Sequence, residues 1–126
     1  MTNTDALQAL ADKVEAGEFP ADVSARDLGL ENFGDGLPII KTMYAAFSGS
    51  LDAAKALHEA LIPGWGWSVG ALHGVSDGFV ATVYSTPHPD AAQFRAFDKV
   101  APARAWLLAI IRALIAQFPQ QQGDSQ

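Results

Sequence analysis

The sequence predicts an α+β fold in which a small antiparallel sheet packs between α-helices, as an α-β-α sandwich. Three stretches carry this prediction: a capped amphipathic helix that ends at Pro63, a hairpin pattern over 65–84, and a wide apolar helix over 101–118. Apolar residues recur at helical spacing in the first and last stretches and alternate in the second. Helices and strands must therefore share one core, and we expect the sheet to be a β-hairpin, alone or with a third strand.

Ser50 is the predicted N-cap of the first of these helices. Its hydroxyl can accept a hydrogen bond from an unpaired backbone N–H of the first turn, and Asp52 lies at the positive end of the helix dipole. Apolar residues then form one stripe: Leu51, Ala54, Leu57 and Leu61. Pro63 and Gly64 should end the helix, because proline cannot continue it and glycine tolerates a positive φ.

Large and small side chains alternate directly after this helix, which indicates a strand. The larger ones share one face of that strand: Trp65, Trp67, Val69 and Ala71. After a turn at 73–78, residues 79–84 have the composition of an antiparallel partner strand. The small residues on the opposite face let a helix approach closely, and their alternative role is self-association, because a two-stranded hairpin is marginal alone.

The final helix is predicted from an apolar face wide enough to cover a sheet. This face comprises Trp106, Leu107, Ile110, Ile111, Leu114, Ile115 and Phe118, with Arg104 and Arg112 at its wet edge. We expect Trp65, Trp67 and Trp106 to form one core, and the alternative for the first two is a platform for a ligand or partner. Pro119 should end the helix and leave 120–126 as a disordered polar tail.

The chain is predicted to be a single α+β domain over 1–119. Its 126 residues, 49% of them apolar, are enough for one core. Residues 1–35 hold an acidic helix at about 4–16, a short helical turn at 24–27 and an irregular loop. Residues 37–41 fit either a short edge strand or the start of a helix, and the sequence leaves both alternatives open.

Residues 44–116 resemble a family of small phage and prophage proteins, those with the phage ABA sandwich domain. The resemblance rests on four short motifs: Ser-Leu-Asp-Ala-Ala at 50–54, Pro-Gly-Trp-Gly-Trp at 63–67, Ala-Pro-Ala at 101–103 and Ile-Arg-Ala-Leu at 111–114. It implies a sheet held between helices and leaves the biochemical role unassigned. The chain departs from the family in a longer helix before Pro63 and a longer connection at 87–98.

Charge is concentrated near the amino terminus. The net charge is −6, and residues 1–35 hold eight acidic and two basic residues, whereas the remaining 91 residues are balanced. This distribution argues against nucleic-acid binding through a basic surface. The absence of cysteine excludes disulfides and thiolate chemistry. Because no secretory signal or bilayer-length apolar run is evident, we expect a cytoplasmic protein that does not enter the membrane, and the phage resemblance implies that the cell is a bacterial host.

Asp12, Glu15 and Glu18 are the predicted partner contacts. They lie off the apolar stripe of the first helix or at its end, where complementary charge would speed encounter with a basic partner. The alternative is that these residues form an ordinary solvated helix face.

No catalytic residue stands out, and His58 is expected at the surface or at the boundary of the core. The enzymatic alternative is a small metal-dependent hydrolase that uses His73, His88 and Asp90. Antiparallel pairing would place His73 and His88 at opposite ends of the hairpin, so we expect no metal site and no cofactor. The missing catalytic constellations predict a non-enzymatic protein, and the resemblance implies a phage or prophage accessory protein. We expect it to bind a phage or host protein, with homo-oligomerisation as a further option.

Overall fold

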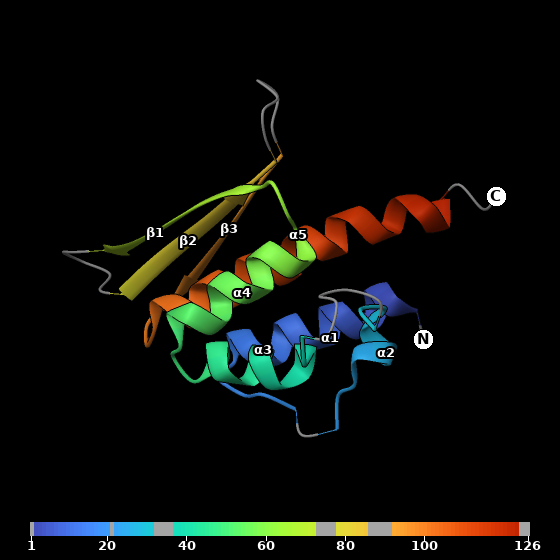
Figure 1. Cartoon of the computed structure of the whole chain (residues 1–126), viewed down its shortest axis with the longest axis horizontal. Helices are drawn as coiled ribbons and strands as arrows, with labels where there is room; N and C mark the ends of the chain where they lie inside the picture. The colour runs from blue at the N-terminus through green and yellow to red at the C-terminus, as the bar shows by residue number, and fades with distance from the viewer. Residues whose placement is uncertain (1, 21, 32–36, 73–77, 86–91, 124–126) are drawn as a thin grey trace.

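The structure is a computed structural model, and it describes residues 2–20, 22–31, 37–72, 78–85 and 92–123. Within them, helices and strands follow one another as α1 (Asn3–Glu15), α2 (Ala25–Leu28), α3 (Ile39–Phe47), α4 (Leu51–Leu61), β1 (Gly66–Leu72), β2 (Gly78–Tyr84), β3 (Gln93–Asp98) and α5 (Pro102–Gly123) (Figure 1). The predicted α+β class and the antiparallel hairpin are thereby confirmed.

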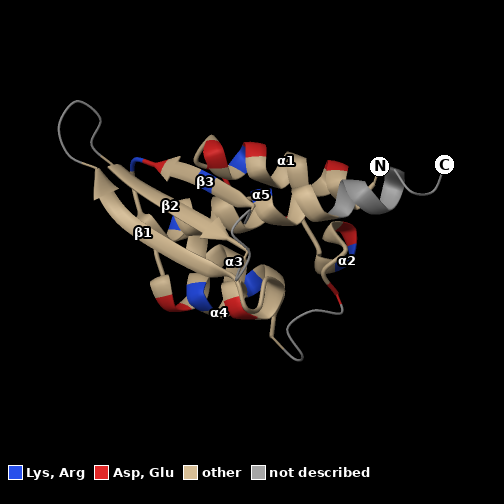
Figure 2. Ribbon diagram, turned by 90° about the horizontal axis from the view of Figure 1, so that it is seen from above, with Lys and Arg blue, Asp and Glu red and all other residues tan. Residues whose placement is uncertain are grey.

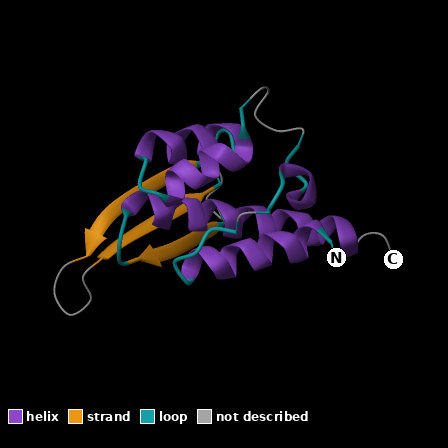
Figure 3. Cartoon of the chain, turned by 90° about the horizontal axis from the view of Figure 1, so that it is seen from below, coloured by secondary structure: helices purple, strands orange, loops and turns teal. Residues whose placement is uncertain are grey.

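The sheet has the strand order β1-β2-β3, and both strand pairs are antiparallel. Helix α5 packs against the sheet, and α1, α3 and α4 pack against α5. The described helices lie on one side of the sheet (Figures 1 and 3), whereas the sandwich prediction expected helices on both faces. The described chain is therefore layered as sheet, α5, and then the remaining helices.

Small residues at the centre of the sheet let α5 approach it. The strand register places Val69, Ala81 and Ala96 in one row, and both alanines are buried. Apart from half-buried Arg104, every residue of α5 from 103 to 111 is buried. A helix that is apolar on all sides is stable only when it is covered on all sides, and here the sheet and the other helices provide that cover.

The ends of α4 agree with the sequence prediction. Ser50 Oγ accepts a hydrogen bond from the backbone N–H of Ala53 at 3.1 Å, and Gly64 has a φ of 84°. The stripe is buried at Ala54, Leu57 and Leu61, whereas Leu51 is exposed. Residues 37–41, for which two alternatives were open, contain the start of α3, so the helical alternative is the one observed.

The first helix begins with a reciprocal capping arrangement. The backbone N–H of Asp5 donates to Thr2 Oγ1 at 3.0 Å, and the backbone N–H of Thr2 donates to the Asp5 carboxylate at 3.1 Å. The hydrogen bonds that the Asp5 carboxylate accepts from Thr2, first from its backbone N–H and then from its side chain, hold the pKa of Asp5 below its ordinary value. The cap fixes the start of the helix that bears most of the predicted partner contacts.

Two predicted boundaries are wrong. Residues 87–98 were expected to be a connection, yet 93–98 form β3, because Phe94 and Ala96 turn toward the core while Gln93 and Arg95 face outward. The last helix does not end at Pro119 but continues to Gly123, so 120–123 are not a disordered tail; 124–126 lie outside the described residues. A proline removes one backbone donor from a helix, which costs stability without forcing the helix to stop.

None of the described helices has the length and hydropathy that crossing a membrane requires.

Two aromatic rings cover glycines on the outer sheet face, which bears no described helix. Gly66 pairs with Tyr84, whose ring occupies the space that a Cβ at Gly66 would need. Gly78 lies beneath the ring of Phe97, 2.7 Å from the position of an added Cβ. Glycine has no side chain to cover its backbone, and here the aromatic rings cover it instead. Aromatic rings stabilise glycines of edge strands in this way.

Gly66→Ala should lower the free energy of unfolding by about 1 kcal/mol, because the new methyl group must displace the Tyr84 ring. Gly70→Ala is the matched control, since Gly70 lies on the same face of β1 and has no atom within 4 Å of the added Cβ. Urea denaturation of both variants measures the difference. Equal stability of the two variants would show that the ring does not rest on Gly66.

Candidate functional site

The acidic residues of the amino-terminal part gather on α1, α2 and the segment between them, with Glu31 shortly after α2 (Figure 2). The seven that lie within the described residues are all exposed: Asp5, Asp12, Glu15, Glu18, Asp22, Asp27 and Glu31. Lys13 and Arg26, the two basic residues of this part, are exposed as well. We call these helices and their connection the acidic face. None of the described carboxylates on this face is buried in the core.

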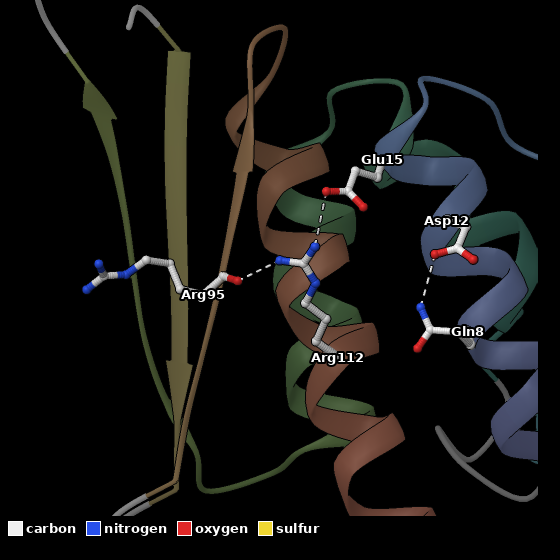
Figure 4. Close-up of polar contacts among 5 residues, drawn as sticks. All are labelled: Gln8, Asp12, Glu15, Arg95 and Arg112. Carbon is white, nitrogen blue, oxygen red and sulfur yellow. Dashed lines mark hydrogen bonds and ion pairs between the residues drawn. The ribbon is translucent and has the colours of Figure 1, made fainter.

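Each of the three predicted partner contacts has a neighbour within the chain. Asp12 accepts a hydrogen bond from Gln8 Nε2 at 3.0 Å. Glu15 reaches Arg112 of α5 at 3.4 Å, as Figure 4 shows, and Glu18 lies 3.6 Å from Lys13. The structure thus places all three at the surface near the end of α1 but directs them to different neighbours.

Arg112 joins three elements through its guanidinium group (Figure 4). One amino group donates to the backbone carbonyl of Arg95 in β3 at 2.8 Å, and the other faces Glu15 of α1. The side chain is 36% exposed and that of Glu15 is 60% exposed. At such exposure the ion pair contributes little stability, whereas the hydrogen bond to β3 fixes the position of the guanidinium.

His58 is buried, which corrects the prediction of a surface or boundary residue. Only 3% of it is exposed. Its Nε2 lies 2.8 Å from the carbonyl oxygen of Trp65, and its Nδ1 lies 3.2 Å from Nε1 of Trp106. A carbonyl only accepts and an indole N–H only donates, so the neutral imidazole must carry its proton on Nε2. Neither ring nitrogen is free to take a proton from a substrate, and the residue is a structural link between α4, α5 and the start of β1.

The tryptophans divide between core and surface. Trp106 is 2% exposed, as the core prediction requires, and its ring stacks on Trp67 with centroids 4.2 Å apart. Trp67 itself is 42% exposed, so it lies at the edge of the core rather than inside it. Trp65 is half-buried and stacks on Phe94 of β3, with centroids 6.1 Å apart. The predicted single tryptophan core therefore holds for Trp106 and is corrected for Trp67.

A hollow opens beside the exposed ring of Trp67. Its volume is about 450 Å³, and α4, β1 and the start of α5 form its walls. Most of its lining is apolar, with Leu51 46% exposed at the rim and with Asp52 and Lys55 as the two charged residues. We call this the β1 hollow. It offers shape and apolar contact but no group placed for acid, base or nucleophilic chemistry.

The residues of the enzymatic alternative, His73, His88 and Asp90, lie outside the described residues. Within the described part of the chain, no group of three or more histidine or acidic residues is arranged to hold a metal ion. The metal-dependent hydrolase therefore stays an alternative hypothesis from sequence.

The sequence did not predict that Arg104 is half-buried and connects α5 to the end of α3. Its Nε donates to the carbonyl of Phe47 at the end of α3 at 3.0 Å, and its guanidinium lies 4.0 Å from the centre of the Phe47 ring. The sequence placed this arginine at a wet edge. The only available signal was its position in the strongly apolar first half of α5.

Comparison with protein-family models, with curated proteins and with solved structures finds no match in any of the three. The resemblance to the phage ABA sandwich family stays a prediction.

Proposed function

We propose that this protein acts by binding a basic protein partner, as a non-enzymatic accessory protein of a phage or prophage in the cytoplasm of its bacterial host. The observation that carries the proposal is the exposure of every described carboxylate on the acidic face. A partner with a basic surface would be drawn to this face from a distance, because complementary charge raises the rate of encounter.

The ion pairs now present on the acidic face do not prevent such binding. Lys13 and Glu18 are 55% and 65% exposed, and the Arg112–Glu15 pair is also open to water. Exposed pairs of this kind contribute about 1 kcal/mol at most, so a partner's arginine or lysine can replace either cation at small cost. The three carboxylates named from the sequence are therefore available.

A second hollow, of about 400 Å³, lies between α1 and α2 on the same face. Its lining includes the apolar residues Ala6, Leu10 and Val23 and three charged residues, of which Asp22 and Asp27 are acidic and Lys13 is basic. A lysine or arginine side chain needs such a combination, because its alkyl stem packs on apolar surface while its charged head requires an anion or water. This hollow supports a basic partner over an acidic one.

Charge reversal tests the proposal. Partners are recovered from a lysate of the bacterial host, and association is then followed for wild type and for the Asp12→Lys, Glu15→Lys, Glu18→Lys variant at low and high salt. We expect the association rate of the variant to fall about tenfold or more at low salt and the difference to shrink as salt screens the charges. Unchanged kinetics would remove the acidic face from the interface.

Two controls separate binding from folding. Glu15→Lys places a cation beside Arg112, so circular dichroism must show that the variant keeps its helices. Glu59→Lys changes an exposed acid on α4 and is the matched change for Asp12→Lys alone. If Glu59→Lys slows association as much as Asp12→Lys does, net charge rather than the acidic face governs binding.

A further inference from the structure

The free edge of β1 lacks the features that normally protect an edge strand. Among the described strands β1 pairs with β2 alone, so alternate N–H and C=O groups point away from the sheet. Its seven residues, Gly-Trp-Ser-Val-Gly-Ala-Leu, include no charge and no proline. A strand of this kind is a template for pairing with another strand.

The opposite edge of the sheet is protected. β3 carries Arg95 and Asp98, and Lys99 follows it directly. Arg112 also donates to the Arg95 carbonyl, which points away from β2 in Figure 4. The contrast shows that one edge is closed by charge and by a side-chain hydrogen bond while the other is left open.

We propose that the β1 edge pairs with β1 of a second copy of this chain, antiparallel and centred on Val69, to give a six-stranded sheet. This register overlaps all seven residues of both strands and keeps the helices of both copies on the same side of the joint sheet. In this register each large side chain lies opposite a small residue of the other copy: Trp67 faces Ala71, and Leu72 faces Gly66. Val69 faces its own counterpart. The strand is thus complementary to itself in volume, which an arbitrary peptide would not be.

The β1 hollow accepts the bulkiest side chain of the second copy. In the proposed register Trp67 of that copy lies over Ala71, which lines the hollow together with Phe79 and Pro102. The ring of Trp67, 42% exposed in the single chain, would then be covered. Burial of a large aromatic surface in a preformed hollow is the usual source of affinity at such interfaces.

Charge does not oppose this pairing. The hollow holds one acid, Asp52, and one base, Lys55, so its charged residues balance and the two copies do not meet through like-charged surfaces. The acidic face, with most of the net charge, lies on the part of the molecule away from β1 (Figure 2). A second copy can therefore approach the β1 edge without bringing the two acidic faces together.

Sedimentation of the untagged chain tests the proposal first. We expect a concentration-dependent shift from the 13.3 kDa chain to a species of twice that mass as the concentration rises from about 1 µM to about 500 µM. A protein that stays monomeric over this range would overturn the proposal. So would a chain that stays monomeric while an added extended peptide changes its tryptophan fluorescence, because the edge would then serve a different partner.

Ala71→Lys tests the surface. Ala71 is exposed and faces the hollow, so the single chain should tolerate lysine, whereas an inward-pointing charge blocks pairing of an edge strand. We expect the dissociation constant of the dimer to rise about 30-fold or more. Ala92→Lys is the matched control, an exposed alanine next to the other edge, and should leave dimerisation unchanged. Equal dimerisation of the two variants would overturn the proposal.

Single cysteines test the register, because the chain has no native cysteine. The two copies of residue 69 would have Cα atoms about 4.5 to 5.5 Å apart, within disulfide reach, so Val69→Cys should form a covalent dimer on mild oxidation. The two copies of residue 68 would lie about 8 Å apart, too far for a bond, so Ser68→Cys should cross-link far less. Val100→Cys, at a position 67% exposed and away from β1, reports random collision. Equal cross-linking of all three variants would contradict pairing in this register.

Discussion

Replacing Trp106 with alanine should lower the free energy of unfolding by about 3 to 5 kcal/mol. The indole is 2% exposed, stacks on Trp67 and donates a hydrogen bond to His58. Its removal leaves a cavity between α4, α5 and β1 that the surrounding elements cannot fill without moving. Chemical denaturation followed by circular dichroism measures the loss, at a concentration low enough for the single chain.

Trp67→Ala is the natural comparison. Because 42% of this residue is exposed in the single chain, its removal should cost about half as much or less. A loss below about 1 kcal/mol for Trp106→Ala would contradict the buried position of the ring.

Replacing His58 with alanine should lower the free energy of unfolding by about 2 to 4 kcal/mol. The change leaves two buried groups without their partners, the indole N–H of Trp106 and the carbonyl of Trp65. An unsatisfied buried polar group costs its full desolvation penalty, which is larger than the net contribution of a typical hydrogen bond. Thermal and urea unfolding both report this loss.

Glu59→Ala, at the neighbouring exposed position of α4, is the control and should change stability by less than about 0.5 kcal/mol. Trp106→Phe removes the indole donor while keeping an aromatic ring, so the double variant with His58→Ala isolates the hydrogen bond between them. We expect a coupling energy of about 1 kcal/mol. Independent effects of the two changes would show that this hydrogen bond does not contribute.

Local signals predicted much of the fold. The Ser50 cap, the stop at Pro63 and Gly64, and the strand predicted from alternating side-chain size each depend on residues a few positions apart, and the structure has the cap, the stop and the strand β1. The strand β3 was missed because its six residues follow a segment that carries two prolines, so the alternation stood out less than the turn signals did.

The surroundings of the candidate site residues were harder to predict because they come from distant parts of the chain. His58 is buried by Trp106, which lies 48 residues away, and Glu15 meets Arg112 across 97 residues. A sequence shows that these side chains can form hydrogen bonds, but it does not show which residue is the partner of each. The exposed charge of the acidic face was accessible to prediction, since an acidic residue without a partner in the core remains in water.

The central place of α5 also affects how the chain folds during synthesis. This helix follows all the other elements in sequence, yet the sheet and the helices α1, α3 and α4 all pack against it. Until its apolar residues leave the ribosome, the earlier elements have no common surface to cover and keep their hydrophobic faces in water. We therefore expect the core to close only after α5 has been translated, and the apolar surfaces of the earlier elements to be prone to aggregation until then.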